Sequence, residues 1–394
     1  MKNNCLTIIA PGHNELDQRV NRVVELAATR FNKVNILYEK RLSQFEKINW
    51  PVNVSCYYVE NTYPRFKVFP KISNFIEAIY HNKIESKNFY IHDSGIVGLL
   101  MAKALRDECG IKAKIIFDYH DHIKWEIHYQ ISKIFPGLLL NKIIGSAFFR
   151  VVRLYLRLRY SRILDGIVGI SDSQINELLE WIKPDKQIAC ISIPNTRQLL
   201  NISNEKLDGE FLDAVDFLWI GNIVDGRDLP ETICCLDELQ KTQRFNLYIF
   251  GNIISKKIFD EICKREYVIY MGPFKSDQDM LELVNEKRLI GLFFGWNDLW
   301  GTGINKISSP NKIFSYINIG VPVIIHSKVN PTAFNIDARL GETFESIEDF
   351  FNCFQSISKE YSRYKKTVNK CRGDYLWEHD LNKRIIHLID KVYI

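Results

Sequence analysis

Short runs of β-branched and aromatic residues alternate with longer stretches of helical periodicity along most of this chain, and this alternation constrains the fold more than any other feature. The first cycle predicts a strand at 6–10, a helix at 17–29 and a strand at 33–38. The same rhythm continues with strands at 89–92, 114–118, 166–170 and 187–192 and helices at 95–109 and 174–181. Strands that alternate with helices in this way form a parallel sheet. The first half of the chain is therefore expected to be an α/β domain.

The rhythm starts again after a weakly apolar, charged stretch at 200–213, which we interpret as a linker. Its elements are strands at 216–220, 245–250, 268–271, 289–294 and 321–325 and helices at 229–241, from Ile253, at 277–285 and at 312–319. A length of 394 residues suits two domains. We expect an α/β architecture of two doubly wound Rossmann-like domains, at 1–199 and 200–374. Ligands of such sheets bind at the carboxyl ends of the strands, so a site in a cleft between the domains is expected.

Positive charge is concentrated in one segment of the chain. Residues 127–164 contain no Asp or Glu and seven Lys or Arg residues. Without these seven charges the net charge of +5 becomes −2. A basic surface spread widely enough to follow a nucleic-acid backbone is therefore not expected, and one positively charged face is. Membrane surfaces and phosphorylated ligands are the partners that such a face suits.

The cysteine pattern favours a reducing compartment. The nine cysteines are scattered, without a C-x-x-C pair, and most lie in apolar runs, which is typical of buried free thiols. The apolar run near the N-terminus is short for a signal peptide and predicts a first strand instead. The most apolar stretch, 134–152, is interrupted by Asn141, Lys142 and Arg150, which argues against a membrane span. We expect a cytoplasmic protein.

The clearest functional signal is the segment Ser309-Pro310-Asn311-Lys312, which predicts the first turn of a helix that ends at Gly320. Serine followed by proline is a common helix start. Free amides at a helix N-terminus beside a lysine suit a phosphate group. An ordinary capped helix would show the same pattern, so the segment needs support from elsewhere in the chain.

That support comes from three glycine turns, each directly after a predicted strand. They are Gly221-Asn222, Gly251-Asn252 and Gly272-Pro273-Phe274. Glycine lets a backbone approach a ligand closely, and Arg227 follows the first of the turns. One glycine after a strand is commonplace, but three in order with an arginine predict a site for a nucleotide diphosphate.

These motifs resemble the donor-binding domain of glycosyltransferase family 4, whose members have the GT-B architecture. The resemblance extends over nearly the whole chain, since the first half is similar to the family at Asp17-Gln-Arg19-Val20, at Phe117-Asp-Tyr-His120-Asp121, at Ile170-Ser171 and at Ile193-Pro194-Asn195. It implies two facing domains and a final helix, 375–394, that crosses back to the first domain. It also implies a retaining transfer of a sugar from a nucleotide-sugar to a glycan acceptor, with no cofactor and no obligatory metal.

The resemblance and the strand-end positions together assign roles to individual residues. The catalytic candidates are His120, Asp121, Arg227 and Lys312; the histidine would orient the sugar, and the cations would stabilise the leaving diphosphate. The donor-binding candidates are Gly12, Gly221, Asn222, Gly251, Asn252, Gly272, Phe274, Ser309, Pro310, Asn311 and Ser315. The acceptor-binding candidates are His13, Asp17, Arg19, His92 and Asp93.

Simpler interpretations stay open for several of these residues. His120 would also suit a hydrogen-bonded turn at a strand end, and Asp17 would suit a helix cap. The consecutive residues His120, Asp121 and His122 suggest a metal site, but neighbouring side chains point in opposite directions, so chelation by all three is not expected. No metal site is predicted.

The chain departs from the family pattern at two places. Ser315 stands where the family usually has the second glutamate of an E-x7-E pair, and Ile307 stands at the first. Asn222 stands where a basic residue often follows the first glycine. A catalytically weak homologue that serves as a membrane-associated binding or scaffold subunit would account for the missing glutamates. A nucleotide-sugar epimerase is a second alternative, because that activity also occurs on two Rossmann-like domains.

The basic segment predicts a membrane-facing helix. Arg150, Arg153 and Arg157 fall on one helical face at spacings i, i+3 and i+7 and are interleaved with large apolar residues. Anionic headgroups attract such a face, and the resemblance implies a lipid-linked acceptor for a bacterial surface polysaccharide. The alternative is an amphipathic helix that packs on the sheet with a solvated basic side.

Overall fold

The computed structural model describes residues 5–13, 17–40, 49–60, 68–93, 95–110, 112–134, 138–197, 199–202, 214–224, 226–274, 276–298, 302–307, 311–329, 340–376 and 380–394. Ser309 and Pro310, which were expected to bind the donor, lie outside these residues. The chain divides into two compact units, which we call unit 1 (Met1–Pro194 with Asp380–Ile394) and unit 2 (Asn195–His379). The boundaries expected from the sequence were 199/200 and 374/375.

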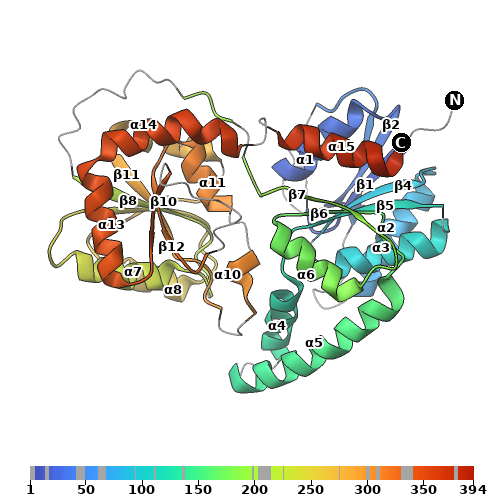
Figure 1. The fold of residues 1–394 in the computed structure, drawn as a ribbon, viewed down its shortest axis with the longest axis horizontal. Helices are drawn as coiled ribbons and strands as arrows, with labels where there is room; N and C mark the ends of the chain where they lie inside the picture. The colour runs from blue at the N-terminus through green and yellow to red at the C-terminus, as the bar shows by residue number, and fades with distance from the viewer. Residues whose placement is uncertain are drawn as a thin grey trace. The chain divides into compact units, whose positions relative to one another are not determined.

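Unit 1 is built on a seven-stranded parallel sheet with strand order β3-β2-β1-β4-β5-β6-β7 (Figure 1). The strands are β1 (Cys5–Ala10), β2 (Lys33–Lys40), β3 (Val54–Glu60), β4 (Asn88–Asp93), β5 (Lys114–Tyr119), β6 (Gly166–Gly169) and β7 (Ala189–Ser192). The strand order reverses beside β1, whose neighbours are β2 and β4. In open α/β sheets this reversal opens a crevice at the carboxyl ends of the strands. The register places His92 of β4 directly beside Asp118 of β5.

Helices cover both faces of this sheet (Figure 1). They are α1 (Gln18–Ala28), α2 (Val68–His81), α3 (Ile96–Cys109), α4 (Ile123–Ile134), α5 (Leu138–Tyr160), α6 (Asp172–Ile182) and α15 (Leu381–Tyr393). Helices α1 and α15 pack together over one face, and α2, α3 and α6 contribute to the apolar core on the other. Tyr393 of α15 donates a hydrogen bond to the carbonyl of Phe89 in β4, so the end of the chain is tied to the middle of the sheet.

Unit 2 has a six-stranded parallel sheet with strand order β10-β9-β8-β11-β12-β13. The strands are β8 (Val215–Ile220), β9 (Leu247–Phe250), β10 (Val268–Gly272), β11 (Arg288–Phe293), β12 (Val323–His326) and β13 (Gly341–Phe344). One apolar core contains side chains of α7 (Leu229–Leu239), α8 (Lys256–Ile262) and α13 (Ile347–Lys359). A second contains side chains of α9 (Leu281–Glu286), α11 (Asn311–Asn318) and α14 (Tyr361–Cys371). The described residues of the unit also form the short elements η2 (Asp277–Met280), α10 (Ile304–Ile307) and η3 (Arg372–Tyr375).

The predicted α/β class of two doubly wound parallel sheets is confirmed. The structure adds strands that the sequence analysis did not predict, among them β3 at the edge of the first sheet. Most side chains of β3 are partly exposed, so it lacks the buried apolar run that marks the inner strands. The helix expected from Ile253 begins instead at Lys256, because Ile253 forms an isolated parallel bridge with Ile223.

Candidate functional site

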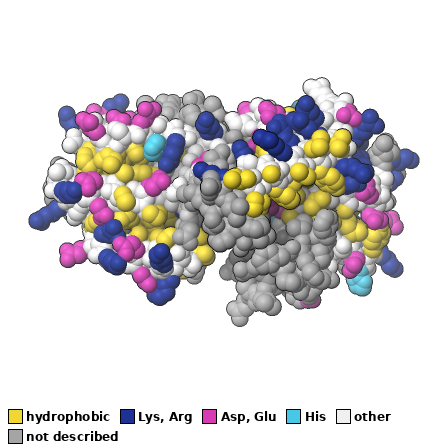
Figure 2. All heavy atoms as spheres, turned by 90° about the horizontal axis from the view of Figure 1, so that it is seen from below, with side chains coloured by type: hydrophobic (Ala, Val, Ile, Leu, Met, Phe, Trp, Pro, Cys, Tyr) yellow, Lys and Arg dark blue, Asp and Glu magenta, His cyan; other side chains and the backbone are white. Residues whose placement is uncertain are grey.

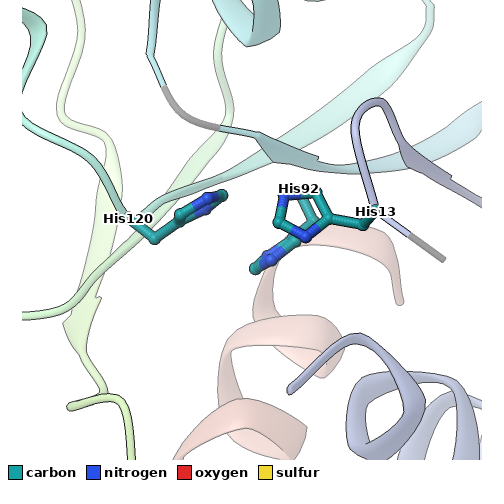
Figure 3. A group of neighbouring side chains, drawn as sticks. All are labelled: His13, His92 and His120. Atoms are coloured by element: carbon teal, nitrogen blue, oxygen red, sulfur yellow. The ribbon is translucent and has the colours of Figure 1, made fainter. Parts of the chain in front are cut away.

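Three histidines meet at the carboxyl edge of the sheet in unit 1 (Figure 3). His13 follows β1, His92 lies in β4 and His120 follows β5, and these three strands are adjacent in the sheet. The ring centroid of His13 lies 4.5 Å from that of His92 and 5.0 Å from that of His120. The rings of His92 and His120 stack with centroids 4.4 Å apart. We call His13, His92 and His120 the histidine cluster.

Two carboxylates hold two of these rings. Asp17 caps α1 by accepting hydrogen bonds from the amides of Arg19 and Val20, and its Oδ2 lies 2.7 Å from Nδ1 of His13. Burial alone would lower the pKa of His13, but the hydrogen bond and charge of Asp17 raise it above the usual value. On His92, Nδ1 lies 2.8 Å from Oδ2 of Asp118. Both rings therefore have their Nδ1 atoms engaged.

Asp118 is a buried carboxylate that gathers several donors. It accepts hydrogen bonds from the hydroxyl of Tyr90 at 2.9 Å and from Nε and Nη2 of Arg19 at 3.0 and 2.8 Å. Burial alone would raise the pKa of Asp118, but the charges of Arg19 and His92 hold it well below its usual range. Nη1 of Arg19 donates to the carbonyls of Ile193 and Pro194. The structure thus places Arg19 in a network that joins α1, β5 and the segment Ile193–Pro194 after β7, beside the cluster.

His120 differs from the other two histidines because no carboxylate of the described residues is hydrogen-bonded to its Nδ1. Burial and the charges of His92 and His13 keep the pKa of His120 well below its usual value. Within the described part of the chain, its buried Nδ1 has no hydrogen-bond partner. Asp93 and Asp121 lie near enough to His13 to raise the pKa of that ring.

His122 belongs to a separate contact, although it lies two residues from His120 in the sequence. Its Nδ1 pairs with Glu177 of α6 at 3.0 Å. His120 and His122 therefore take part in different contacts, although an extended chain would place residues i and i+2 on the same side. The histidines that the structure brings together, His13, His92 and His120, come from the ends of three different strands instead.

A buried ion pair marks the corresponding edge of unit 2. Nζ of Lys312, in the first turn of α11, lies 3.0 Å from Oδ1 of Asp228 and 4.1 Å from the ring centroid of Trp219. The Lys312 side chain is only 5% exposed. Burial lowers its pKa to about 8; the positive charge of Arg227 adds to this effect, and the negative charge of Asp228 opposes it. The guanidinium of Arg227 itself lies 4.3 Å from the ring centroid of Trp296.

Two of the glycine turns lie beside this ion pair. A Cβ atom built on Gly221 would be 3.6 Å from Cε of Lys312. A Cβ atom on Gly251 would be 1.7 Å from the carbonyl oxygen of Gly221, so only glycine fits there. Gly272 lies next to Gly251, because the amide of Gly251 donates a hydrogen bond to the carbonyl of Gly272. The side chains of Asn222 and Asn252 are exposed and hydrogen-bonded to each other at 3.1 Å.

The surroundings of Ser315 could not be predicted from the sequence. Its side chain is fully buried, and its hydroxyl accepts a hydrogen bond from Nε of Arg197 at 3.1 Å. The Arg197 guanidinium also approaches Asp277 at 3.9 Å and the ring of Phe274 at 5.9 Å. Neither Arg197 nor Asp277 belongs to a motif in the sequence, so no local signal marked them. Asn311, by contrast, is exposed at the start of α11.

Helix α5 presents an apolar stripe to the surface. The exposed hydrophobic side chains are Ile143, Phe148, Val151, Leu154, Tyr155 and Leu158, with Val151 65% and Leu158 73% exposed. We call these six residues the α5 stripe. Figure 2 shows a band of hydrophobic side chains bordered by Lys and Arg on the unit that carries α5. Among the described helices, none is long and apolar enough to cross a bilayer.

The arginines expected on a single outward face of α5 have different surroundings. Arg153 pairs with the carboxylate of Glu180 in α6 at 3.5 Å, and Arg157 donates to the carbonyl of the same residue. Arg150 is exposed. Two of the three arginines contact α6, so the side of α5 that faces solvent is formed by the α5 stripe.

Comparison with known proteins identifies structural neighbours only. No protein-family model matches the chain, and no curated protein matches it. Sucrose-phosphate synthase from Thermosynechococcus elongatus superposes with a TM-score of 0.65 at 13% identity, covering 99% of this chain and 98% of that one. The apo lipopolysaccharide outer core galactosyltransferase WaaB gives a TM-score of 0.60 at 11% identity, with coverage of 98% and 99%. A structure described as trehalose-6-phosphate from E. coli bound with UDP-2-fluoro glucose gives 0.63 at 9% identity, with 99% of each chain covered. These likenesses show that the chain has two Rossmann-like domains of the GT-B type.

Proposed function

We propose that this chain is a glycosyltransferase that uses a nucleotide-sugar donor and binds its diphosphate in unit 2. The observation that carries the proposal is the buried Lys312–Asp228 pair beside the turns of Gly221 and Gly251. In a site with little water, a fixed cation stabilises negative charge on a leaving diphosphate far better than it would in water. A diphosphate would compete with Asp228 for the Lys312 ammonium, and Arg227 would contribute a second cation.

His120 is the candidate for contact with the reacting sugar. It lies at the carboxyl end of β5, and its pKa is well below the usual value, so its imidazole is neutral at pH 7 and its Nδ1 is available to a hydroxyl. A neutral imidazole orients a sugar by hydrogen bonds without adding charge. We expect a retaining reaction in which the leaving phosphate accepts the proton of the acceptor, so that no protein nucleophile is needed and no covalent glycosyl-enzyme forms.

We further propose a glycan acceptor, linked to a lipid, in the synthesis of a bacterial surface polysaccharide. The neighbours support this class of substrate: WaaB is a lipopolysaccharide galactosyltransferase, and the structure of TarM from S. aureus holds alpha-GlcNAc-glycerol and UDP. The α5 stripe supports a membrane-bound acceptor, because apolar side chains beside exposed cations suit an anionic bilayer surface. Such an enzyme would work at the inner face of the cell membrane.

The donor site is tested by isothermal titration with UDP, GDP, ADP and CMP. One of them should bind selectively to the wild type, and Lys312→Gln should weaken that binding by at least about tenfold, since a charge-assisted hydrogen bond contributes about 1.5–3 kcal/mol. In this variant the Asp228 carboxylate keeps the hydrogen bonds that it accepts from Nε1 of Trp219 and from the amide of Phe294. Lys306→Gln is the matched control, because Lys306 is an exposed lysine in α10. Equal affinity in both variants would refute the placement of the diphosphate.

The two alternatives give different outcomes in a product assay. A scaffold subunit would bind the nucleotide-sugar without transferring the sugar to any lipid-linked or free glycan. An epimerase would convert the nucleotide-sugar with no acceptor present. The surroundings of Ser315 support the scaffold over the epimerase, because this buried position carries a hydroxyl that accepts a hydrogen bond from Arg197 and offers no carboxylate to a donor.

A further inference from the structure

The histidine cluster has the composition and placement of a metal site. Each ring offers one nitrogen, and the three ligand atoms all lie within 4.8 Å of one another. Three nitrogens around a tetrahedral zinc ion, at about 2.0–2.1 Å each, are about 3.4 Å apart. The cluster is therefore somewhat wider than a loaded site, and one ring must turn for the three nitrogens to meet a single ion.

His120 is the ring that can make this rotation. His13 and His92 are held at Nδ1 by Asp17 and Asp118. The stacked arrangement of His120 on His92 is not a chelating one, because lone pairs lie in the ring planes and these planes are nearly parallel, at 16°. Nothing in the described part of the chain holds Nδ1 of His120, so this ring turns without breaking a hydrogen bond at that atom.

The two carboxylates also provide what metal-binding histidines require. A ligating histidine almost always donates its second ring N–H to a carboxylate or carbonyl, which fixes the tautomer and orients the lone pair of the other nitrogen. Asp17 and Asp118 accept at Nδ1 of His13 and His92, and this leaves Nε2 of each ring as the ligand. Oδ2 of Asp17 lies 3.8 Å from Nε2 of His92, so a negative charge borders the centre of the cluster.

We propose that His13, His92 and His120 bind one divalent transition-metal ion, with Zn²⁺ as the best-fitting ion, at the carboxyl edge of the sheet in unit 1. Three imidazoles suit zinc and its borderline-soft neighbours, whereas Mg²⁺ and Ca²⁺ prefer oxygen ligands. Three protein ligands leave a fourth position for water or for a hydroxyl of a bound ligand. The site goes beyond the proposed function, since the resemblance implies a transfer without an obligatory metal.

The test uses the full chain after treatment with a chelator. Titration calorimetry with Zn²⁺ should show one saturable ion per chain. Titration with Co²⁺ should produce visible absorption bands of a low-symmetry site without the near-ultraviolet charge-transfer bands of sulfur ligands, which distinguishes the cluster from the exposed thiols of Cys190, Cys234 and Cys263. Neither readout depends on sugar transfer, so the metal site and the proposed function fail or succeed separately.

Variants locate the ion. His120→Ala should lower zinc affinity by more than about tenfold while the metal-free protein still shows a cooperative melting transition, because no hydrogen bond at Nδ1 is lost. Asp17→Asn, which keeps a good helix cap, should lower affinity by about 10–100-fold by releasing His13. A double variant of two exposed histidines, His81→Ala with His387→Ala, is the control and should bind as the wild type does.

Three results would overturn the proposal. The first is no saturable zinc binding by the wild type. The second is sulfur charge transfer in the cobalt spectrum. The third is wild-type affinity in both His120→Ala and Asp17→Asn. If one of these variants does not fold, the other decides the assignment.

Discussion

Nucleotide binding by this protein should weaken as the pH rises through 8, and the reason is the burial of Lys312. An ammonium with a pKa of about 8 is half deprotonated at that pH, whereas an exposed lysine stays charged until above pH 10. The donor diphosphate is attracted by the charged form. Between pH 7 and 9, the fraction of protein molecules with a charged Lys312 should therefore fall, whereas exposed lysines keep their charge.

The size of the effect follows from the pKa. The charged fraction of Lys312 is about 0.9 at pH 7 and about 0.1 at pH 9, so affinity for a nucleoside diphosphate should fall about tenfold, or about 1.4 kcal/mol. The terminal phosphate of the ligand loses its second proton near pH 6, and this ionisation is almost complete at pH 7. The negative charge that it adds would strengthen binding as the pH rises, not weaken it. A fall in affinity between pH 7 and 9 therefore reports the loss of charge on Lys312.

Calorimetric titration at pH 7, 8 and 9 measures this dependence. Lys312→Arg keeps the positive charge at every one of these values and should remove the slope. Asp228→Asn removes the charge that opposes the lowering of the pKa, so the decrease should begin below pH 8. Affinity that stays constant between pH 7 and 9 in the wild type, or a slope that survives in Lys312→Arg, would show that the Lys312 ammonium does not bind the diphosphate.

Three further predictions concern unit 1. His120→Ala should abolish sugar transfer in a product assay and leave nucleotide affinity unchanged in calorimetry; full transfer activity would remove this ring from the site. Arg19→Ala should destabilise the protein by about 3–5 kcal/mol, because it leaves the buried Asp118 without its cation; a shift in the denaturant midpoint measures this, and an unchanged midpoint would contradict the network. Leu154→Asp with Leu158→Asp should release the protein from vesicles of phosphatidylglycerol in a sedimentation assay, and retention equal to the wild type would argue against membrane contact by the α5 stripe.

The sequence predicts individual strands and helices better than it predicts which of them lie side by side in the fold. The alternating rhythm identifies β1, β4 and β5, because each is a short and almost entirely buried strand with β-branched or aromatic residues at its centre. His13, His92 and His120 are each predicted at a strand end, but His13 and His92 as acceptor-binding candidates and His120 as a catalytic one, with no contact expected among them. Their meeting depends on β1 lying between β2 and β4 in the sheet, and strand order is a property of packing that no single run of residues carries.

The same limit explains the surroundings of α5 and of Lys312. Helical spacing correctly places Arg150, Arg153 and Arg157 along one side of a helix, but the side that faces solvent is decided by the position of α6, which receives two of the three. Lys312 was selected for its place in a helix start. Its partner Asp228 lies far away in the sequence, and its altered pKa comes from burial, which only the folded unit provides.

The path of the chain through unit 1 has a consequence for biosynthesis. Helix α15, which covers one face of the first sheet, follows the whole of unit 2 in the sequence. About 200 residues separate Pro194 from the last turn of α15, and a ribosome adds them in about 10–40 s. During that time β5 and β7 have no α15 against them, while unit 2 is already emerging. Unit 1 thus begins before unit 2 and is completed after it, and chaperones that protect apolar surface on nascent chains should bind this protein until α15 has been made.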